Sequence, residues 1–95
     1  MTGPVNDVSV VAESDGRFTV EVRTATAVTT HEVTVPEGYA AALGCGDVAT
    51  SDLVAASFDF LLEREPSTSI LRRFRLPQIA DYFPEYPASV SRYLR

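Results

Sequence analysis

The sequence predicts an α+β fold in which an N-terminal three-stranded antiparallel β-meander is packed by four to five short C-terminal helices. Three observations support this prediction. Apolar and polar residues alternate over the first third of the chain, which is the period of a half-buried strand. From about residue 50, apolar residues recur every three or four positions, as on the buried face of a helix. Pro66, Pro77, Pro84 and Pro87 then divide the remaining chain into short segments.

Three strands are expected in the first third. Residues 8–12 alternate, and Ser14-Asp15-Gly16 follows with turn chemistry, because Asp and Gly tolerate positive φ. Residues 17–23 carry the clearest alternation in the chain. The inner face of this strand is formed by Phe18, Val20 and Val22. A third strand over residues 30–35 places Val33 and Val35 inward, and Pro36 ends it. Such a sheet is marginally stable alone, so helices must cover its apolar face.

Five helices are expected after the sheet. The first runs from Pro36 to Gly44, and a longer one, capped by Asp47 or Thr50, reaches about Glu65. The buried stripe of this longer helix is Leu53, Val54, Ser57, Phe58, Leu61 and Leu62. The third helix follows Pro66, directs Ile70, Leu71 and Phe74 inward and displays Arg72, Arg73 and Arg75. Pro77 and Pro87 each begin a short further helix. All 95 residues are expected to form one domain, with residues 1–6 as a disordered tail.

Charge is unevenly distributed along this acidic chain, whose net charge is −5. Residues 1–65 hold eleven of the thirteen carboxylates and carry a net −8, whereas residues 66–95 carry a net +3. All eight basic residues are arginine. No apolar run is long enough to cross a bilayer, no signal peptide is recognisable, and the one cysteine fits a reducing compartment. We therefore expect a cytoplasmic protein without membrane association.

Groups for catalysis or metal binding are scarce. His31 is the one histidine, and its position in the strand places it on the same face as Val33 and Val35, as expected of a structural or surface histidine. Cys45 lies between two glycines in an expected loop, where we expect a bystander thiol; a redox-sensing thiol that an oxidant can reach is the alternative. Zinc needs about four nitrogen or sulfur ligands, and this chain has one histidine and one cysteine. We expect no enzyme activity, no cofactor, no metal site and no small-molecule substrate.

Residues 76–94 resemble the helix-turn-helix of bacterial transcription regulators, in the Ile79-Ala80 pair and the Val-Ser-Arg-Tyr-Leu segment at 90–94. The resemblance implies a recognition helix with four candidate base or phosphate contacts, Ser89, Ser91, Arg92 and Arg95. Arg72, Arg73 and Arg75 would then add phosphate contacts. The pattern departs from the motif at Pro84, where the turn usually has glycine, and at Glu85, where it usually has an apolar residue.

Two other resemblances concern the fold rather than an activity. The pattern FLLEREP at 60–66, continuing to YFPEY at 82–86, resembles that of a group of short uncharacterised bacterial proteins. This resemblance implies a bacterial source and one module over residues 8–95. Residues 11–20 are similar to the N-terminal strands of HicB-type antitoxins, although the later proline-glycine stretch of that family has no counterpart here.

The leading functional hypothesis is a small, non-catalytic protein-interaction or regulatory module that binds a partner protein or itself. Aromatic residues and arginines, both common at interfaces, are concentrated in the C-terminal third. Phe74 and Phe83 are expected to cover the sheet. The candidate interaction residues are Arg72, Arg73, Arg75, Tyr86, Arg92 and Tyr93. The alternative is a nucleic-acid-binding protein that uses the helix-turn-helix-like segment and the arginine-rich face.

Overall fold

The computed structural model describes residues 7–94, so the disordered tail expected at residues 1–6 lies outside the described residues. In chain order, the elements are β1 (Asp7–Ser14), β2 (Arg17–Arg23), β3 (Val28–Thr34), α1 (Tyr39–Ala42), α2 (Thr50–Leu62), the 3₁₀ turn η1 (Ser67–Ser69), β4 (Arg73–Arg75), α3 (Gln78–Tyr82), α4 (Tyr86–Ser89) and the 3₁₀ turn η2 (Val90–Tyr93). None of these helices is long and apolar enough to span a membrane.

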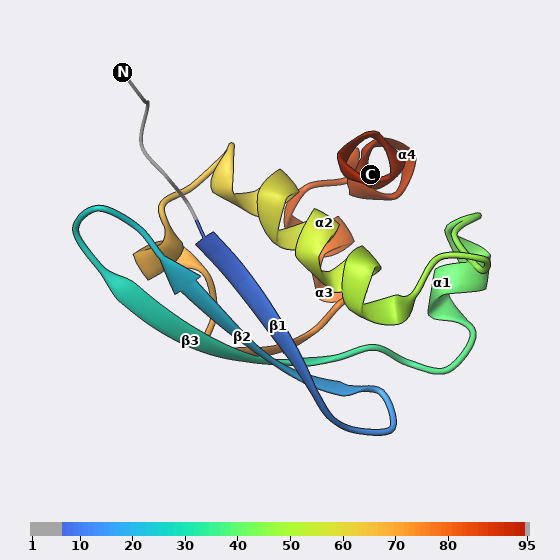
Figure 1. Cartoon of the computed structure of the whole chain (residues 1–95). Coiled ribbons are helices and arrows are strands. Elements are labelled where there is room, and N and C mark those ends of the chain that lie inside the picture. Colours follow the sequence, from blue (N-terminus) through green and yellow to red (C-terminus); the bar gives the residue numbers. More distant parts are fainter. Residues whose placement is uncertain (1–6, 95) are drawn as a thin grey trace.

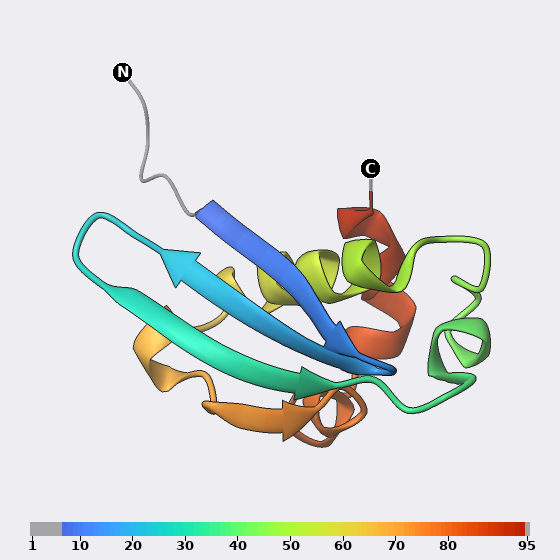
Figure 2. The ribbon, with the colours of Figure 1, turned by 60° about the horizontal axis from the view of Figure 1, so that its bottom comes forward.

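The four strands form one mixed sheet in the order β1-β2-β3-β4 (Figure 2). The first three strands are the antiparallel meander that the sequence predicts. The fourth strand, β4, lies parallel to β3 and pairs Val33 with Phe74. Parallel strands need a long crossover, and here residues 35–72, which include α1 and α2, supply it.

The helix predicted after Pro66 is wrong. Only the 3₁₀ turn η1 forms there, and residues 73–75 are the edge strand β4. The spacing of Ile70 and Phe74 fits a helix, but Arg73, Phe74, Arg75 and Leu76 also alternate with the period of a strand. Pairing with β3 favours the strand, because it buries Phe74 and Leu76 under α2 and leaves both arginines exposed.

The turn between β1 and β2 depends on Gly16, as the sequence predicts. Its φ is +72°, and a Cβ there would lie 2.8 Å from the carbonyl oxygen of Val35. The backbone N–H of Val35 donates to the Gly16 carbonyl at 2.7 Å, so the turn and the end of β3 are tied together. Beside the turn, the β1–β2 register shifts between Ala12 and Ser14.

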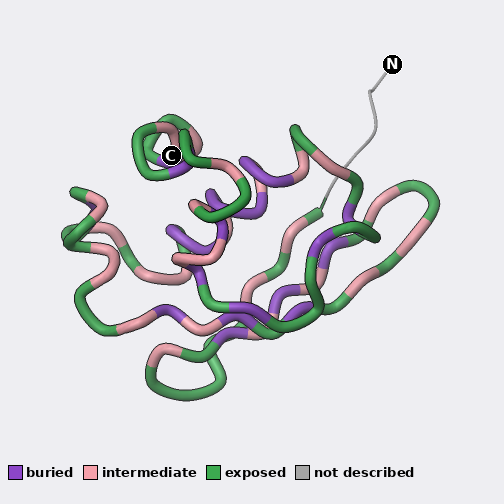
Figure 3. The backbone as a smooth tube through the Cα atoms, turned by 180° about the vertical axis from the view of Figure 1, so that it is seen from behind, coloured by how far each residue is buried: buried purple, intermediate pink, exposed green. Residues whose placement is uncertain are grey.

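α2 and the C-terminal helices lie on one side of the sheet, and α1 lies beyond its end (Figure 1). α2 lies across that face and presents the predicted stripe, from Leu53 to Leu61, to the strands. Figure 3 shows the buried residues gathered along α2 and the middle of the sheet, with exposed residues along the loops. The sequence also predicts helices at the positions of α1, α3 and α4. The predicted N-cap of α2 is wrong, because Ala49 rather than Asp47 or Thr50 occupies that position.

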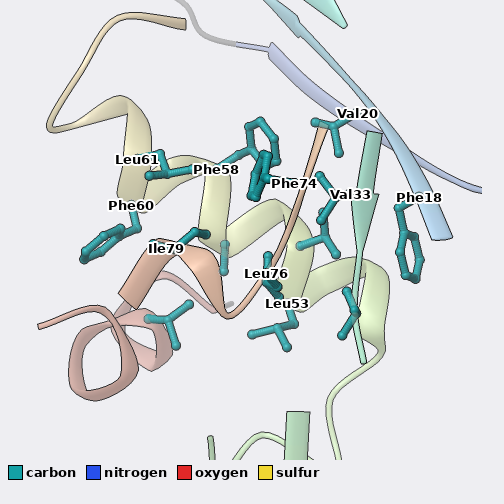
Figure 4. Packing of buried hydrophobic residues seen from close by; sticks show 14 of the residues in the cluster. Phe18, Val20, Val33, Leu53, Phe58, Phe60, Leu61, Phe74, Leu76 and Ile79 are labelled. Atoms are coloured by element: carbon teal, nitrogen blue, oxygen red, sulfur yellow. The ribbon is translucent and has the colours of Figure 1, made fainter. Parts of the chain in front are cut away.

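Two aromatic residues of α2 point into different parts of the core (Figure 4). The ring of Phe58 lies 5.3 Å from His31 and 5.9 Å from Phe74, on the sheet side. Phe60, which the predicted stripe omits, packs edge-on against three rings of the C-terminal segment: Phe83, Tyr86 and Tyr93. α2 therefore joins the sheet to the C-terminal helices.

The opposite face of the sheet carries polar side chains. Among residues 7–94, those that point to this side are exposed or half-buried, so no described element packs on it. Charges alternate in sign across the hollow there, which Glu13, Arg17, Glu32 and Arg73 help to line. This outer face therefore has no large charged field of one sign.

Candidate functional site

An apolar groove lies beside β4, between the end of α2 and α3, and we call it the β4 groove. It is lined by Leu61, Glu65, Ser69, Ile70, Leu71, Phe74, Gln78, Ile79, Tyr82 and Phe83. Figure 4 shows three of these, Leu61, Phe74 and Ile79, which come from α2, β4 and α3. Three separate elements thus converge on one depression at the open edge of the sheet.

The local sequence explains how the groove forms. Ile70, Phe74 and Ile79 are buried and fix the floor. Pro77 begins α3 directly after β4, so this five-residue helix turns back over the strand. Leu71 and Tyr82 remain on the surface, with 47% and 65% of their areas exposed. They are two of the four large apolar side chains exposed among residues 7–94, and both line the β4 groove.

The size of the groove fits a side chain better than a metabolite. Its volume is about 200 Å³. Small-molecule sites usually enclose about 300–1,000 Å³ and contain a few convergent polar groups. Within residues 7–94 every buried side-chain nitrogen or oxygen already has a hydrogen-bond partner, so none is held unpaired for a ligand. The β4 groove can accept one or two apolar side chains.

The charges around the groove are mainly positive on the β4 side. Arg72, Arg73 and Arg75 are all exposed. Arg73 forms an ion pair with Glu32 at 3.2 Å, and the other two arginines make no ion pair within residues 7–94. Glu65 lines the opposite wall, and burial raises the pKa of its carboxyl group. These arginines lie on or beside β4 but do not line the groove, and Glu65 is the one charged residue in its described lining.

The outer edge of β4 has no partner strand among the described residues. Towards β3, the N–H of Glu32 donates to the Arg72 carbonyl and the N–H of Leu76 donates to the Thr34 carbonyl. The parallel ladder alternates, so the backbone groups of Arg73 and Arg75 point away from β3. The side chain of Gln78 accepts the Arg75 N–H at 2.8 Å and covers part of this edge.

Tyr86 is not at the surface, contrary to its prediction as an interaction residue. It is fully buried, and its hydroxyl lies 2.6 Å from the hydroxyl of Ser57 on α2. Burial raises the pKa of the Tyr86 phenol, although the Ser57 hydrogen bond acts in the opposite direction. Because Ser57 offers a polar partner inside the core, the phenol has no need to reach solvent.

Tyr93 is half-buried and used within the chain. Its hydroxyl donates to Glu63 at 2.7 Å, and the Arg64 guanidinium lies 3.7 Å above the Phe60 ring. Arg64 also pairs with Glu85 at 3.2 Å. The pKa of Glu85 is lowered first by its own backbone amide and then by Arg64. These contacts fasten the C-terminal segment to the end of α2.

The predicted nucleic-acid contacts do not gather on one surface. Ser91 and Arg92 are exposed on η2, Ser89 is half-buried at the end of α4, and Arg95 lies outside the described residues. Tyr86 and Val90 of the same segment are buried, so α4 and η2 pack as part of the core. β4 and its arginines lie on the other side of α3 from α4 (Figure 2).

His31 and Cys45 are both buried. His31 lies on the predicted inner face of β3, with Nδ1 2.8 Å from the Leu71 carbonyl and Nε2 2.9 Å from the Thr29 hydroxyl. Carbonyl oxygens only accept, so Nδ1–H donates to Leu71. Cys45 is 2% exposed because its side chain packs into the core, so the alternative of an oxidant-accessible thiol is wrong. No group of three His, Cys, Asp or Glu residues within 7–94 could hold a metal ion.

The β4 groove itself was not foreseen from the sequence. The residues that line it come from three segments, and their convergence depends on β4, where the sequence predicts a helix. The available signal was the alternation from Arg73 to Leu76. The chain matches no protein-family model, no curated protein and no solved structure, so the groove and the charges beside it are the basis for inferring a function.

Proposed function

We propose that this chain is a non-catalytic interaction module that binds a segment of a partner protein in the β4 groove. One observation carries the proposal: Leu71 and Tyr82, two exposed apolar side chains from separate elements, line the same apolar depression. Isolated exposed apolar residues are ordinary on a protein surface, whereas two that converge on a hollow indicate a binding site. Exposure of these apolar side chains to water is unfavourable in free energy, and a partner that buried them would remove that penalty.

The chemistry of the groove supports a protein partner. Aromatic side chains and arginine are enriched at protein interfaces; Tyr82 lines the groove, and Arg73 and Arg75 are exposed on the strand that borders it. The volume of about 200 Å³ suits the side chain of a partner residue. Nucleophilic catalysis would need a nucleophile within hydrogen-bond reach of a base, and among the described lining residues neither Ser69 nor Tyr82 forms a hydrogen bond with Glu65.

A peptide-display selection on the immobilised full-length chain tests this proposal. Selected peptides should lose at least tenfold in affinity for Leu71→Asp and for Tyr82→Asp. Both sites are on the surface, so the variants should fold. Val28→Asp is the matched control, because Val28 is 56% exposed on the sheet and does not line the groove. Failure to select peptides, or selected peptides that bind all three variants equally, would contradict the proposal.

The nucleic-acid alternative remains a prediction with its own test. Exposed Arg72, Arg73 and Arg75 favour it, whereas the net charge of −5 opposes binding to a polyanion. It predicts that a labelled single-stranded or duplex oligonucleotide binds at 50 mM salt and is released at 200 mM. Replacing the three arginines with glutamine should remove this binding. Absence of binding at low salt would exclude the alternative.

A further inference from the structure

The partner segment that fits the β4 groove can be specified from the edge of the sheet beside it. We infer that the occupant is an extended segment with alternating acidic and apolar residues, which adds to β4 as a fifth strand. This inference rests on the proposed function. It is carried by three features together: an unpaired strand edge, an apolar groove on one face of that strand and arginines on the other face.

The strand edge supplies the backbone contacts. The backbone groups of Arg73 and Arg75 point away from β3, and among residues 7–94 only the Gln78 side chain satisfies one of them. An incoming strand would hydrogen-bond to these groups and displace Gln78 from the Arg75 N–H. Backbone pairing of this kind gives affinity with little dependence on sequence. Specificity must therefore come from the side chains.

The two faces of β4 set the side-chain pattern of the partner. In the register with β3, Arg73 and Arg75 lie opposite Glu32 and Thr34 on the outer face, whereas Phe74 lies opposite Val33 on the helix-covered face. Residues opposite each other on neighbouring strands share a face. Successive residues of an added strand would therefore meet arginine, then the groove, then arginine. The matching sequence is acidic, apolar, acidic.

Charge complementarity favours this occupant over a neutral strand. Arg75 makes no ion pair with any described residue, and the single ion pair of Arg73, with Glu32, is exposed at both ends. Exposed pairs of this kind hold weakly, so Arg73 can also interact with a carboxylate on the added strand. The one opposing charge is Glu65 in the groove wall, and it would face the apolar side chain of the partner.

The first probe is the amidated heptapeptide Gly-Glu-Val-Glu-Leu-Glu-Gly with a fluorophore coupled to its N-terminal amine, with binding followed by anisotropy. A peptide of the same composition with all three glutamates adjacent should bind at least tenfold more weakly, because it breaks the alternation. Replacing the glutamates with lysine should abolish binding.

The double variant Arg73→Gln with Arg75→Gln should bind the first peptide at least tenfold more weakly. The control double variant Arg17→Gln with Arg23→Gln, on β2, should change the affinity less than twofold.

Two variants of residues that line the groove test the same peptide affinity further. Glu65→Gln removes the carboxylate opposite the arginines and should tighten binding of the acidic peptide by about two- to fivefold. Gln78→Ala frees the Arg75 N–H and should also tighten binding, because no side chain then has to be displaced. Loss of affinity in Gln78→Ala would contradict the displacement of Gln78 from the Arg75 N–H by the peptide backbone.

Backbone methylation of the peptide gives the decisive result. N-methyl groups on the three glutamates, or instead on valine and leucine, block alternate edges of an extended strand. One set should abolish binding and the other should change it less than threefold. Loss with the glutamate set indicates an antiparallel added strand, and loss with the apolar set indicates a parallel one. Equal effects of the two sets would overturn strand addition.

Failure of this inference can be told apart from failure of the proposed function. Display-selected peptides that require Leu71 and Tyr82 but lack alternation or acidic residues would leave the interaction module intact and overturn the acidic strand. No binding of the heptapeptide at millimolar concentration would also overturn it. An oligonucleotide of equal charge is measured in parallel with the heptapeptide. If it binds more tightly than the heptapeptide and its binding depends on Arg73 and Arg75, this edge is assigned to nucleic acid instead.

Discussion

The two edges of the sheet differ in length, charge and protection. β1 is an eight-residue strand with Asp7 and Glu13 near its ends, and a register irregularity lies between Ala12 and Ser14. β4 has three residues, two of them arginine, and an apolar groove beside it. An exposed edge is a hazard unless charge, irregularity or short length limits pairing. The β1 edge is therefore protected by charge and irregularity, whereas the β4 edge is protected by its short length and its arginines.

The charges of β1 oppose self-pairing in a specific register. An antiparallel pair of β1 strands that keeps apolar residues opposite one another would place Val8 opposite Ala12 and Asp7 opposite Glu13. Like charges directly opposite each other are unfavourable. The β4 edge carries arginines in the corresponding positions, so it repels a second β4 and attracts an acidic strand. The charges on the two edges thus disfavour pairing of either edge strand with a copy of itself.

The largest expected effect concerns how each edge strand is anchored. Phe74 is 6% exposed, so Phe74→Ala should lower the free energy of unfolding by about 3–5 kcal/mol. Val10→Ala on β1 should cost about 1 kcal/mol, because Val10 is only half-buried. Urea denaturation of the two variants measures the difference. If the two variants lost similar amounts of free energy of unfolding, both edge strands would depend equally on buried side chains, and this difference between the edges would not hold.

A second contrast lies in the turn that holds β1 against β2. Gly16→Ala should destabilise the chain by about 2–3 kcal/mol, because φ is +72° and the new Cβ would meet the Val35 carbonyl. Gly44→Ala is the control. Gly44 has a φ of +79° but open space around it, so about 1 kcal/mol is expected. Thermal or urea unfolding of both variants is sufficient, and equal losses would show that the Val35 contact has no effect.

The start of β4 depends on His31. In His31→Phe the ring volume is largely kept, but the Leu71 carbonyl and the Thr29 hydroxyl lose their partner. We expect a loss of about 1–2 kcal/mol, as for buried polar groups left unpaired. Thr30→Val, on the exposed side of the same strand, should stay within about 0.5 kcal/mol. An unchanged stability in His31→Phe would mean that another group satisfies the Leu71 carbonyl.

The smallest expected effect is that of the ion pair on the outer face. Glu32→Gln removes the partner of Arg73, and unfolding in urea should change by less than about 0.5 kcal/mol, since both side chains are exposed. A loss above about 1 kcal/mol would show that Arg73 is committed to holding β3 and β4 together. In that case it would be less free to meet a carboxylate from outside.

Sequence reasoning succeeded where one local pattern decides the structure. The alternation of residues 17–23, the turn at Gly16 and the helical stripe of residues 53–61 were each predictable from neighbouring residues. Residues 73–75 were not predictable in this way, because the short alternation from Arg73 to Leu76 competes with the helical spacing of Ile70 and Phe74, and pairing with β3 decides between them. Tyr86 was misplaced for a similar reason: its partner Ser57 lies on another element. Contacts between segments distant in the sequence were not visible in local patterns.

The parallel pairing of β4 also sets the order in which the molecule can mature. During synthesis the meander can pair as soon as Thr34 has emerged from the ribosome, because its contacts are local. The β4 groove cannot exist until residues up to Phe83 have emerged and α3 has turned back over the strand. A nascent chain that has formed the meander therefore still lacks the groove. Groove binding would distinguish a chain whose later segments have folded from one in which only the meander has formed.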